Sequence, residues 1–113
     1  MNEQLSLVYL YGFSPLLESK LSTVKKIIEN QLNLGAQITF IFIHDAVIGT
    51  SHKHSTSPLM KELLQLPLEF YSMIPDFKAR GIDPEKLQPK IKGIDYEDLV
   101  NILATTSKIV SWM

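Results

Sequence analysis

The sequence of 113 residues contains no cysteine. A chain without a thiol forms no disulfide and offers no thiolate ligand to zinc or to an iron–sulfur cluster. It also carries no persulfide and no thiol nucleophile of its own, because both require a cysteine sulfur. Any reaction of this protein that uses a sulfur nucleophile must therefore obtain that group from another molecule.

The charge balance and the absence of long apolar runs exclude two further classes. Eleven Lys and Arg residues stand against twelve Asp and Glu residues, a net charge of -1, and strong direct binding to nucleic acid requires a clustered basic excess. The longest strongly apolar run, residues 38–43, is far shorter than the roughly 20 residues that span a bilayer. The N-terminus also lacks the basic segment of a signal peptide. We therefore expect a cytoplasmic protein without a membrane partner, folded as a single domain over residues 1–113.

Strand and helix signals alternate along the chain. The predicted strands are the apolar and β-branched runs at residues 5–11, 38–43, 68–73, 91–94 and 108–113. The first predicted helix starts at Ser14-Pro15 and ends at Gly35, and two shorter helices cover residues 57–66 and 75–80. Asp95 is predicted to cap a fourth helix that follows it. Residues 44–57 are predicted to form a loop, and residues 82–90 an irregular connection.

The first helix and the second strand show the clearest apolar patterns. The helix carries one apolar stripe at spacings of three and four residues: Leu17, Leu21, Val24, Ile28 and Leu32. The strand at residues 38–43 is apolar on both faces, as expected when helices cover both sides of a sheet. The alternation predicts an α/β fold with three layers (α/β/α) and a five-stranded, mostly parallel sheet, flavodoxin-like in general architecture.

Three histidines in or beside the long predicted loop are the main candidates for metal chemistry. His44, His52 and His54, with Asp45 beside the first, could form a zinc or nickel site without cysteine. Solvated loop histidines are the alternative, because no helical or hairpin spacing orients these ligands toward one point. We expect no cofactor, no metal and no catalytic residue, and keep the metal site as the alternative hypothesis.

Four short motifs resemble the DsrH/TusB family and follow one another in the same order along the chain as in that family. They are His44-Asp45-Ala46-Val47 at a strand end, Phe70-Tyr71-x-Met73 followed by Asp76-Phe77-Lys78-Ala79-Arg80-Gly81-Ile82, then Ile94-Asp95-Tyr96-x-Asp98-Leu99-Val100, and the terminal Ser111-Trp112. The family turn usually has Gln and Gly where this chain has His44 and Ala46. The first helix region and the loop at residues 52–57 are longer than the family pattern.

The resemblance implies a fold and a role. It implies a DsrE/DsrF/DsrH-like domain that serves as an accessory subunit in intracellular sulfur relay, where a sister subunit carries the persulfide cysteine. The processes that such a relay is implied to supply with sulfur are 2-thiolation of the tRNA wobble uridine and dissimilatory sulfur oxidation. The implied partners are DsrE/DsrF-like (TusD/TusC-like) subunits and a TusA-like or DsrC-like sulfur carrier, assembled in an oligomer. The lack of cysteine agrees with the accessory role. The alternative is a small metal-dependent enzyme or ligand-binding module that uses residues 44–54.

The matched positions and the carboxyl ends of the predicted strands define an expected partner surface. Its members are His44, Asp45, Ala46, Val47, Asp76, Phe77, Arg80, Gly81, Asp95, Tyr96 and Trp112. We expect Asp45 to accept hydrogen bonds from loop N–H groups, and Tyr96 to contribute its ring. Phe77 and Ile82 are expected to supply apolar contact area to a partner.

Overall fold

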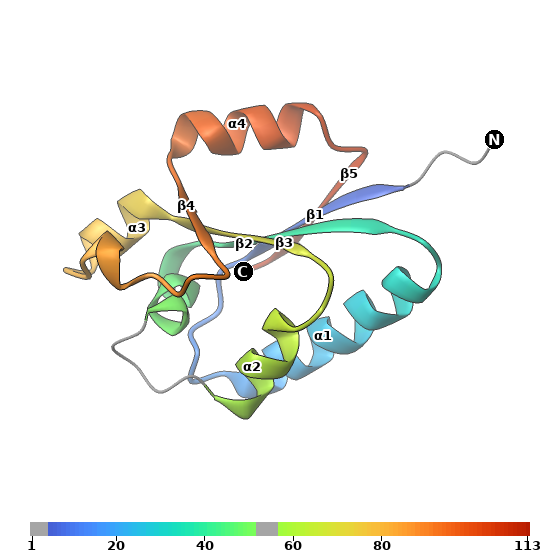
Figure 1. Cartoon of the computed structure of the whole chain (residues 1–113), viewed down its shortest axis with the longest axis horizontal. Coiled ribbons are helices and arrows are strands. Elements are labelled where there is room, and N and C mark those ends of the chain that lie inside the picture. The colour runs from blue at the N-terminus through green and yellow to red at the C-terminus, as the bar shows by residue number, and fades with distance from the viewer. Residues whose placement is uncertain (1–4, 52–56) are drawn as a thin grey trace.

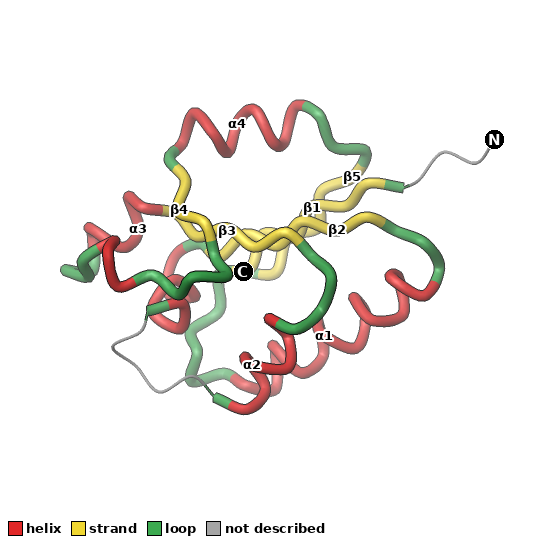
Figure 2. The backbone as a smooth tube through the Cα atoms, in the orientation of Figure 1, coloured by secondary structure: helices red, strands yellow, loops and turns green. Residues whose placement is uncertain are grey.

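The computed structural model describes residues 5–51 and 57–113 and places five strands in one sheet (Figures 1 and 2). The strands are β1 (Ser6–Tyr11), β2 (Gln37–Phe42), β3 (Glu69–Met73), β4 (Lys92–Ile94) and β5 (Lys108–Trp112). Their order across the sheet is β4-β3-β2-β1-β5, and every neighbouring pair is parallel. The predicted five-stranded α/β fold is confirmed.

Helices cover both faces of the sheet and make three layers, as Figure 1 shows. One face carries α1 (Glu18–Asn33) and α2 (Pro58–Leu64), and the other face carries α4 (Tyr96–Ala104). The short helix α3 (Ile74–Ala79) lies at the end of the sheet where the strands finish. In the part of the chain that is described, no helix has the length and apolarity needed to cross a membrane.

The larger core lies between the sheet and the α1–α2 layer. Phe40 occupies its centre, in register with Tyr9 on one side and Phe70 on the other. All three side chains point to the same face, because side chains alternate along a strand and neighbours in register share a face. Leu21, Val24 and Ile28 of α1 complete this core, whereas Leu17 of the predicted stripe is exposed. The opposite face is more thinly covered, since α4 contributes no fully buried residue.

The start of α1 corrects one expectation. The helix begins at Glu18 rather than at Ser14-Pro15. The Ser14 hydroxyl accepts the Leu16 N–H at 3.2 Å and the Ser14 carbonyl accepts the Leu17 N–H at 2.9 Å, so these residues form a turn. Ser14 therefore bonds backbone groups locally instead of capping a helix, a competition that short hydroxyl side chains often win.

Residues 44–50 correct a second expectation. The predicted loop contains a 3₁₀ helix, η1 (His44–Thr50), in which Ala46 and Val47 are buried. The Thr50 hydroxyl donates to the Val47 carbonyl at 2.6 Å and also lies 3.1 Å from the Ser72 hydroxyl. The buried side chains and the bonds of Thr50 hold this segment against β3, although its sequence carries no helical periodicity. A second short 3₁₀ helix, η2 (Pro84–Lys86), lies within the predicted irregular connection.

Candidate functional site

An ion pair joins η1 to α3 at the carboxyl end of the sheet. The Arg80 guanidinium donates from Nε and approaches with Nη2, both 3.0 Å from Asp45 Oδ1. Its Nη1 donates to the Asp76 carbonyl at 3.1 Å. Such a half-exposed ion pair contributes only about 0–1 kcal/mol to stability. Its main effect is therefore to orient two side chains from segments 35 residues apart in sequence.

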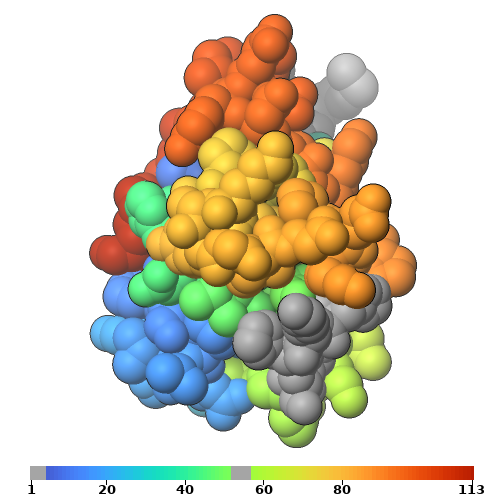
Figure 3. Space-filling view, turned by 90° about the vertical axis from the view of Figure 1, so that its left-hand side faces the viewer, coloured from blue at the N-terminus to red at the C-terminus, as the bar shows by residue number. Residues whose placement is uncertain are grey.

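His44 adopts an unusual backbone conformation that a second carboxylate supports. Its φ is 50°, in the left-handed region that non-glycine residues rarely occupy. The His44 N–H donates to Asp76 Oδ2 at 2.8 Å. This corrects the expectation for Asp45: Asp76 is the carboxylate that binds the loop N–H, while Asp45 binds Arg80. We call His44, Asp45, Asp76 and Arg80 the η1–α3 surface. In Figure 3, the gold atoms of α3 lie directly above the green atoms of η1.

Three members of the expected partner surface are core residues. Ala46 is 3% exposed, and Val47 and Phe77 are fully buried. Phe77 is the buried residue of α3 and fastens that helix to the core. The expectation that Phe77 supplies contact area to a partner is therefore wrong. Ile82 is half-buried, and Gly81, which follows α3 at φ +69°, is exposed.

The remaining expected residues lie at the ends of β4 and β5. Asp95 is the N-cap of α4, and Tyr96 beside it is 61% exposed. Trp112 is half-buried, and its carbonyl accepts the Gly12 N–H at 2.8 Å. A Cβ added to Gly12 would lie 3.0 Å from Met113 Cβ and 3.2 Å from His44 Cδ2. The ends of β1 and β5 therefore meet the η1–α3 surface closely at this glycine.

The role of Asp95 as a helix cap lowers the pKa of its own carboxyl. Its side chain accepts the Asp98 N–H at 2.9 Å, while Asp98 accepts the Asp95 N–H at 3.2 Å. The bond from the Asp98 backbone is the main reason that the pKa of Asp95 lies below its usual value. A carboxyl with a lowered pKa stabilises the fold at neutral pH, and that contribution disappears as pH falls through the lowered pKa.

We expect Asp95→Asn to make the melting temperature less dependent on pH in the acidic range. The neutral amide can still cap α4 but does not titrate, so the wild type should lose more stability than the variant between pH 6 and 3. Thermal unfolding followed by circular dichroism across that range measures the difference. Parallel pH curves for the two proteins would contradict the role of this carboxylate.

The described residues give the metal hypothesis no complete ligand set. Within residues 5–51 and 57–113, no group of three or more His, Cys, Asp or Glu side chains is placed to hold a metal ion. His52 and His54 lie outside the described residues, so the hypothesis that they join His44 stays a prediction.

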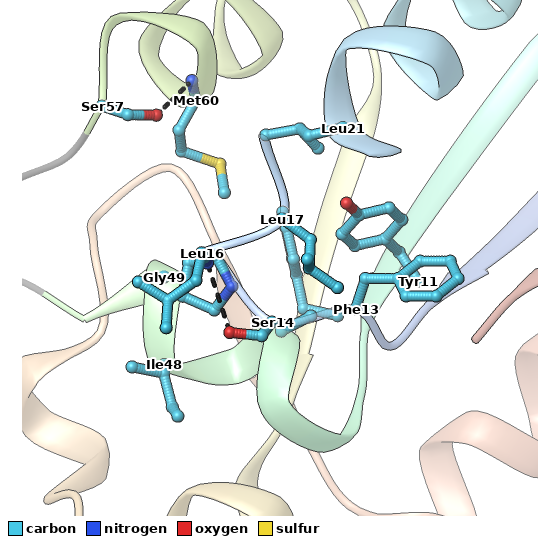
Figure 4. A pocket seen from close by; sticks show the side chains of 13 residues that line it. Tyr11, Phe13, Ser14, Leu16, Leu17, Leu21, Ile48, Gly49, Ser57 and Met60 are labelled. Carbon is cyan, nitrogen blue, oxygen red and sulfur yellow. Dashed lines mark hydrogen bonds between the residues drawn. The ribbon is translucent and has the colours of Figure 1, made fainter. Parts of the chain in front are cut away.

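A cavity beside η1 was not predicted from the sequence. It has a volume of about 470 Å³ and lies between the β1–α1 connection, η1 and the start of α2 (Figure 4). Its lining is Tyr11, Phe13, Ser14, Pro15, Leu16, Leu17, Leu21, Phe42, Ala46, Ile48, Gly49, Ser57 and Met60. The sequence contains one signal for this cavity: Leu16 and Leu17 directly follow Pro15, at positions where a capped helix would expose polar residues.

Comparisons with known proteins identify relatives for this arrangement. A family model described as DsrH-like protein matches residues 14–109. The structure of the ychN protein of E. coli is similar with a TM-score of 0.72 and 16% identity, over 96% of this chain and 100% of that one. A protein of unknown function from Methanobacterium thermoautotrophicum also gives a TM-score of 0.72, at 13% identity, over 96% and 99% of the two chains. No curated protein matches the sequence. At these identities the structural likeness shows the fold.

Proposed function

The chain belongs to the DsrH-like family, and from this premise we propose that it is a cysteine-free accessory subunit of a cytoplasmic sulfur-relay complex. The family match over residues 14–109 carries the proposal, since the family implies a complex with partner subunits. The lack of cysteine supports the accessory role, because transfer of sulfane sulfur requires a thiolate. The proposed partners are DsrE/DsrF-like (TusD/TusC-like) subunits and a TusA-like or DsrC-like carrier.

In the proposed complex the sulfur never bonds to this chain. The thiolate of an acceptor attacks the terminal sulfur of the partner's persulfide, and the partner cysteine leaves as a thiolate. This chain would bind beside that cysteine and orient its loop. The final product would be a thiolated tRNA wobble uridine or a sulfur-oxidation intermediate.

The η1–α3 surface is the proposed contact, together with Gly81, Asp95, Tyr96 and Trp112. The exposed groups among these residues lie where the strands end, the usual ligand side of an open parallel sheet. His44 and Asp45 are exposed, and Arg80 holds Asp45 in one orientation. Polar groups fixed in advance cost less conformational entropy on binding, which favours a specific contact.

A labelled-sulfur assay tests the proposal. We expect the isolated chain to take up no label from a cysteine desulfurase, and to co-elute with a DsrE-like partner encoded in the same genome. With that partner present, transfer to a TusA-like or DsrC-like acceptor should become faster. Stable labelling of the isolated chain would contradict the accessory role, and so would failure to bind any DsrE-like or DsrF-like protein of its own genome.

His44→Gly separates binding from folding in the same assay. Glycine adopts a positive φ without strain, so the variant should fold while lacking the imidazole. We expect at least a severalfold weaker complex with an unchanged circular dichroism spectrum. Asn33→Gly, an exposed change at the far end of α1, is the matched control and should bind normally. Equal binding by the two variants would remove His44 from the contact.

A further inference from the structure

The cavity beside η1 has the size and lining of a small-molecule site. Its volume of about 470 Å³ falls within the range of roughly 300–1,000 Å³ that such sites occupy. Among the residues that the structure describes, no charged side chain lines the cavity. An ionised ligand would lose its hydration there without gaining a counter-charge from these side chains.

Tyr11 supplies the polar feature of the cavity that folding leaves unused. Its side chain is 3% exposed, and its ring packs against Phe13 and Phe40 at centroid distances of 5.8 and 5.5 Å. Among the described residues the Tyr11 hydroxyl has no hydrogen-bond partner, whereas the Tyr9 hydroxyl on the same strand donates to Gln31. No described side-chain oxygen or nitrogen is both buried from solvent and unpartnered, so water in the cavity reaches the Tyr11 hydroxyl, and a ligand acceptor can take the place of that water.

The other two hydroxyls in the described part of the lining already act within the fold. Ser14 Oγ accepts the Leu16 N–H at 3.2 Å, and Ser57 Oγ accepts the Met60 N–H at 3.1 Å (Figure 4). Burial raises the pKa of Tyr11 to about 12, so its hydroxyl keeps its proton at neutral pH and acts as a donor. The matching group on a ligand is an acceptor without a charge.

We propose that this cavity binds an uncharged, mainly apolar small molecule that presents a carbonyl oxygen to the Tyr11 hydroxyl. The apolar part of the ligand lies against Phe13, Leu17 and Leu21, and its carbonyl accepts the Tyr11 hydroxyl in place of water. This binding function is separate from the proposed sulfur relay, because no residue of the η1–α3 surface lines the cavity.

Two naphthalenes of similar shape test the proposal directly. The probes are 2-acetylnaphthalene, which has a ketone, and 2-ethylnaphthalene, which has no acceptor. Isothermal titration should show saturable binding of both, with the ketone bound roughly fivefold more tightly, as one hydrogen bond gained in exchange for water allows. The anion 2-naphthoate should bind more weakly than the ketone. No saturable binding of the ketone, or tighter binding of the anion, would overturn the proposal.

Tyr11→Phe is the informative variant, with Tyr9→Phe as its matched control. Tyr11→Phe should abolish the preference for the ketone, so that both probes bind about equally, because only the hydroxyl is lost. It should fold at least as well as the wild type, since that hydroxyl has no partner among the described residues. Tyr9→Phe removes a hydroxyl outside the cavity and should keep the preference. Ile48→Trp, which fills part of the cavity, should weaken both probes. An unchanged preference in Tyr11→Phe, or unchanged binding in Ile48→Trp, would contradict the site.

Discussion

Phe77→Ala is expected to lower the free energy of unfolding by about 3–5 kcal/mol, the usual cost of truncating a fully buried phenylalanine. That loss is a large share of the roughly 5–15 kcal/mol that stabilises a domain. Phe77 is the one fully buried residue of α3, a helix of six residues that is too short to be stable without its packing. Loss of this contact should therefore release Asp76 and Arg80 from η1. Urea denaturation measures the free energy.

Two substitutions at and beside Phe77 serve as controls. Phe77→Leu keeps most of the apolar volume and should cost clearly less than Phe77→Ala. Lys78→Ala changes the exposed neighbour and should stay within about 0.5 kcal/mol of the wild type. A loss below about 1 kcal/mol in Phe77→Ala would show that the cavity collapses at little cost. The anchoring role of this residue would then be wrong.

Asp76→Ala is expected to cost about 1–3 kcal/mol, because it leaves the His44 N–H without its acceptor. The carboxylate also lies in the first turn of α3, where the helix dipole favours a negative charge. The second expected result is faster hydrogen exchange at the His44 amide, which no longer has a protein acceptor. Urea denaturation and amide exchange by NMR measure the two effects.

The matched variant Asp76→Asn keeps an oxygen that can accept the His44 N–H. It should lose less stability and protect that amide better than Asp76→Ala. Glu97→Ala removes another exposed first-turn carboxylate, on α4, and should leave the His44 amide unaffected. If Asp76→Ala left exchange at His44 unchanged, the bond would not control this backbone segment.

The element order could be predicted because each element has a local signal. Phe40, Ile41 and Phe42 in succession indicate a strand covered on both faces, and the structure buries all three. The caps at Ser57 and Asp95 were also predictable, since the side chain and the N–H groups that it accepts lie within three residues. The start of α1 was not, because Ser14 has a local alternative in the turn that it forms with Leu16.

The candidate site could be predicted only as a set of residues. The sequence placed His44, Asp45, Asp76 and Arg80 near strand ends, but it assigned the loop N–H to Asp45. The bond from the His44 N–H to Asp76 crosses 32 residues, and no local pattern encodes such a pairing. The burial of Phe77 was likewise undetermined, because six residues are too few to define which side of a helix faces the core.

The sequence by itself determined the β–α alternation, the parallel sheet, the DsrH-like family and the absence of any thiol, because periodicity, motifs and composition are properties of the chain. Only the tertiary structure decided which carboxylate holds His44, which expected surface residues are buried, and that Tyr11 borders a cavity without a hydrogen-bond partner among the described residues. These features arise where η1, α3 and the β1–α1 connection meet. Contacts between segments far apart in sequence depend on how the whole chain packs, and packing is not written in any local window.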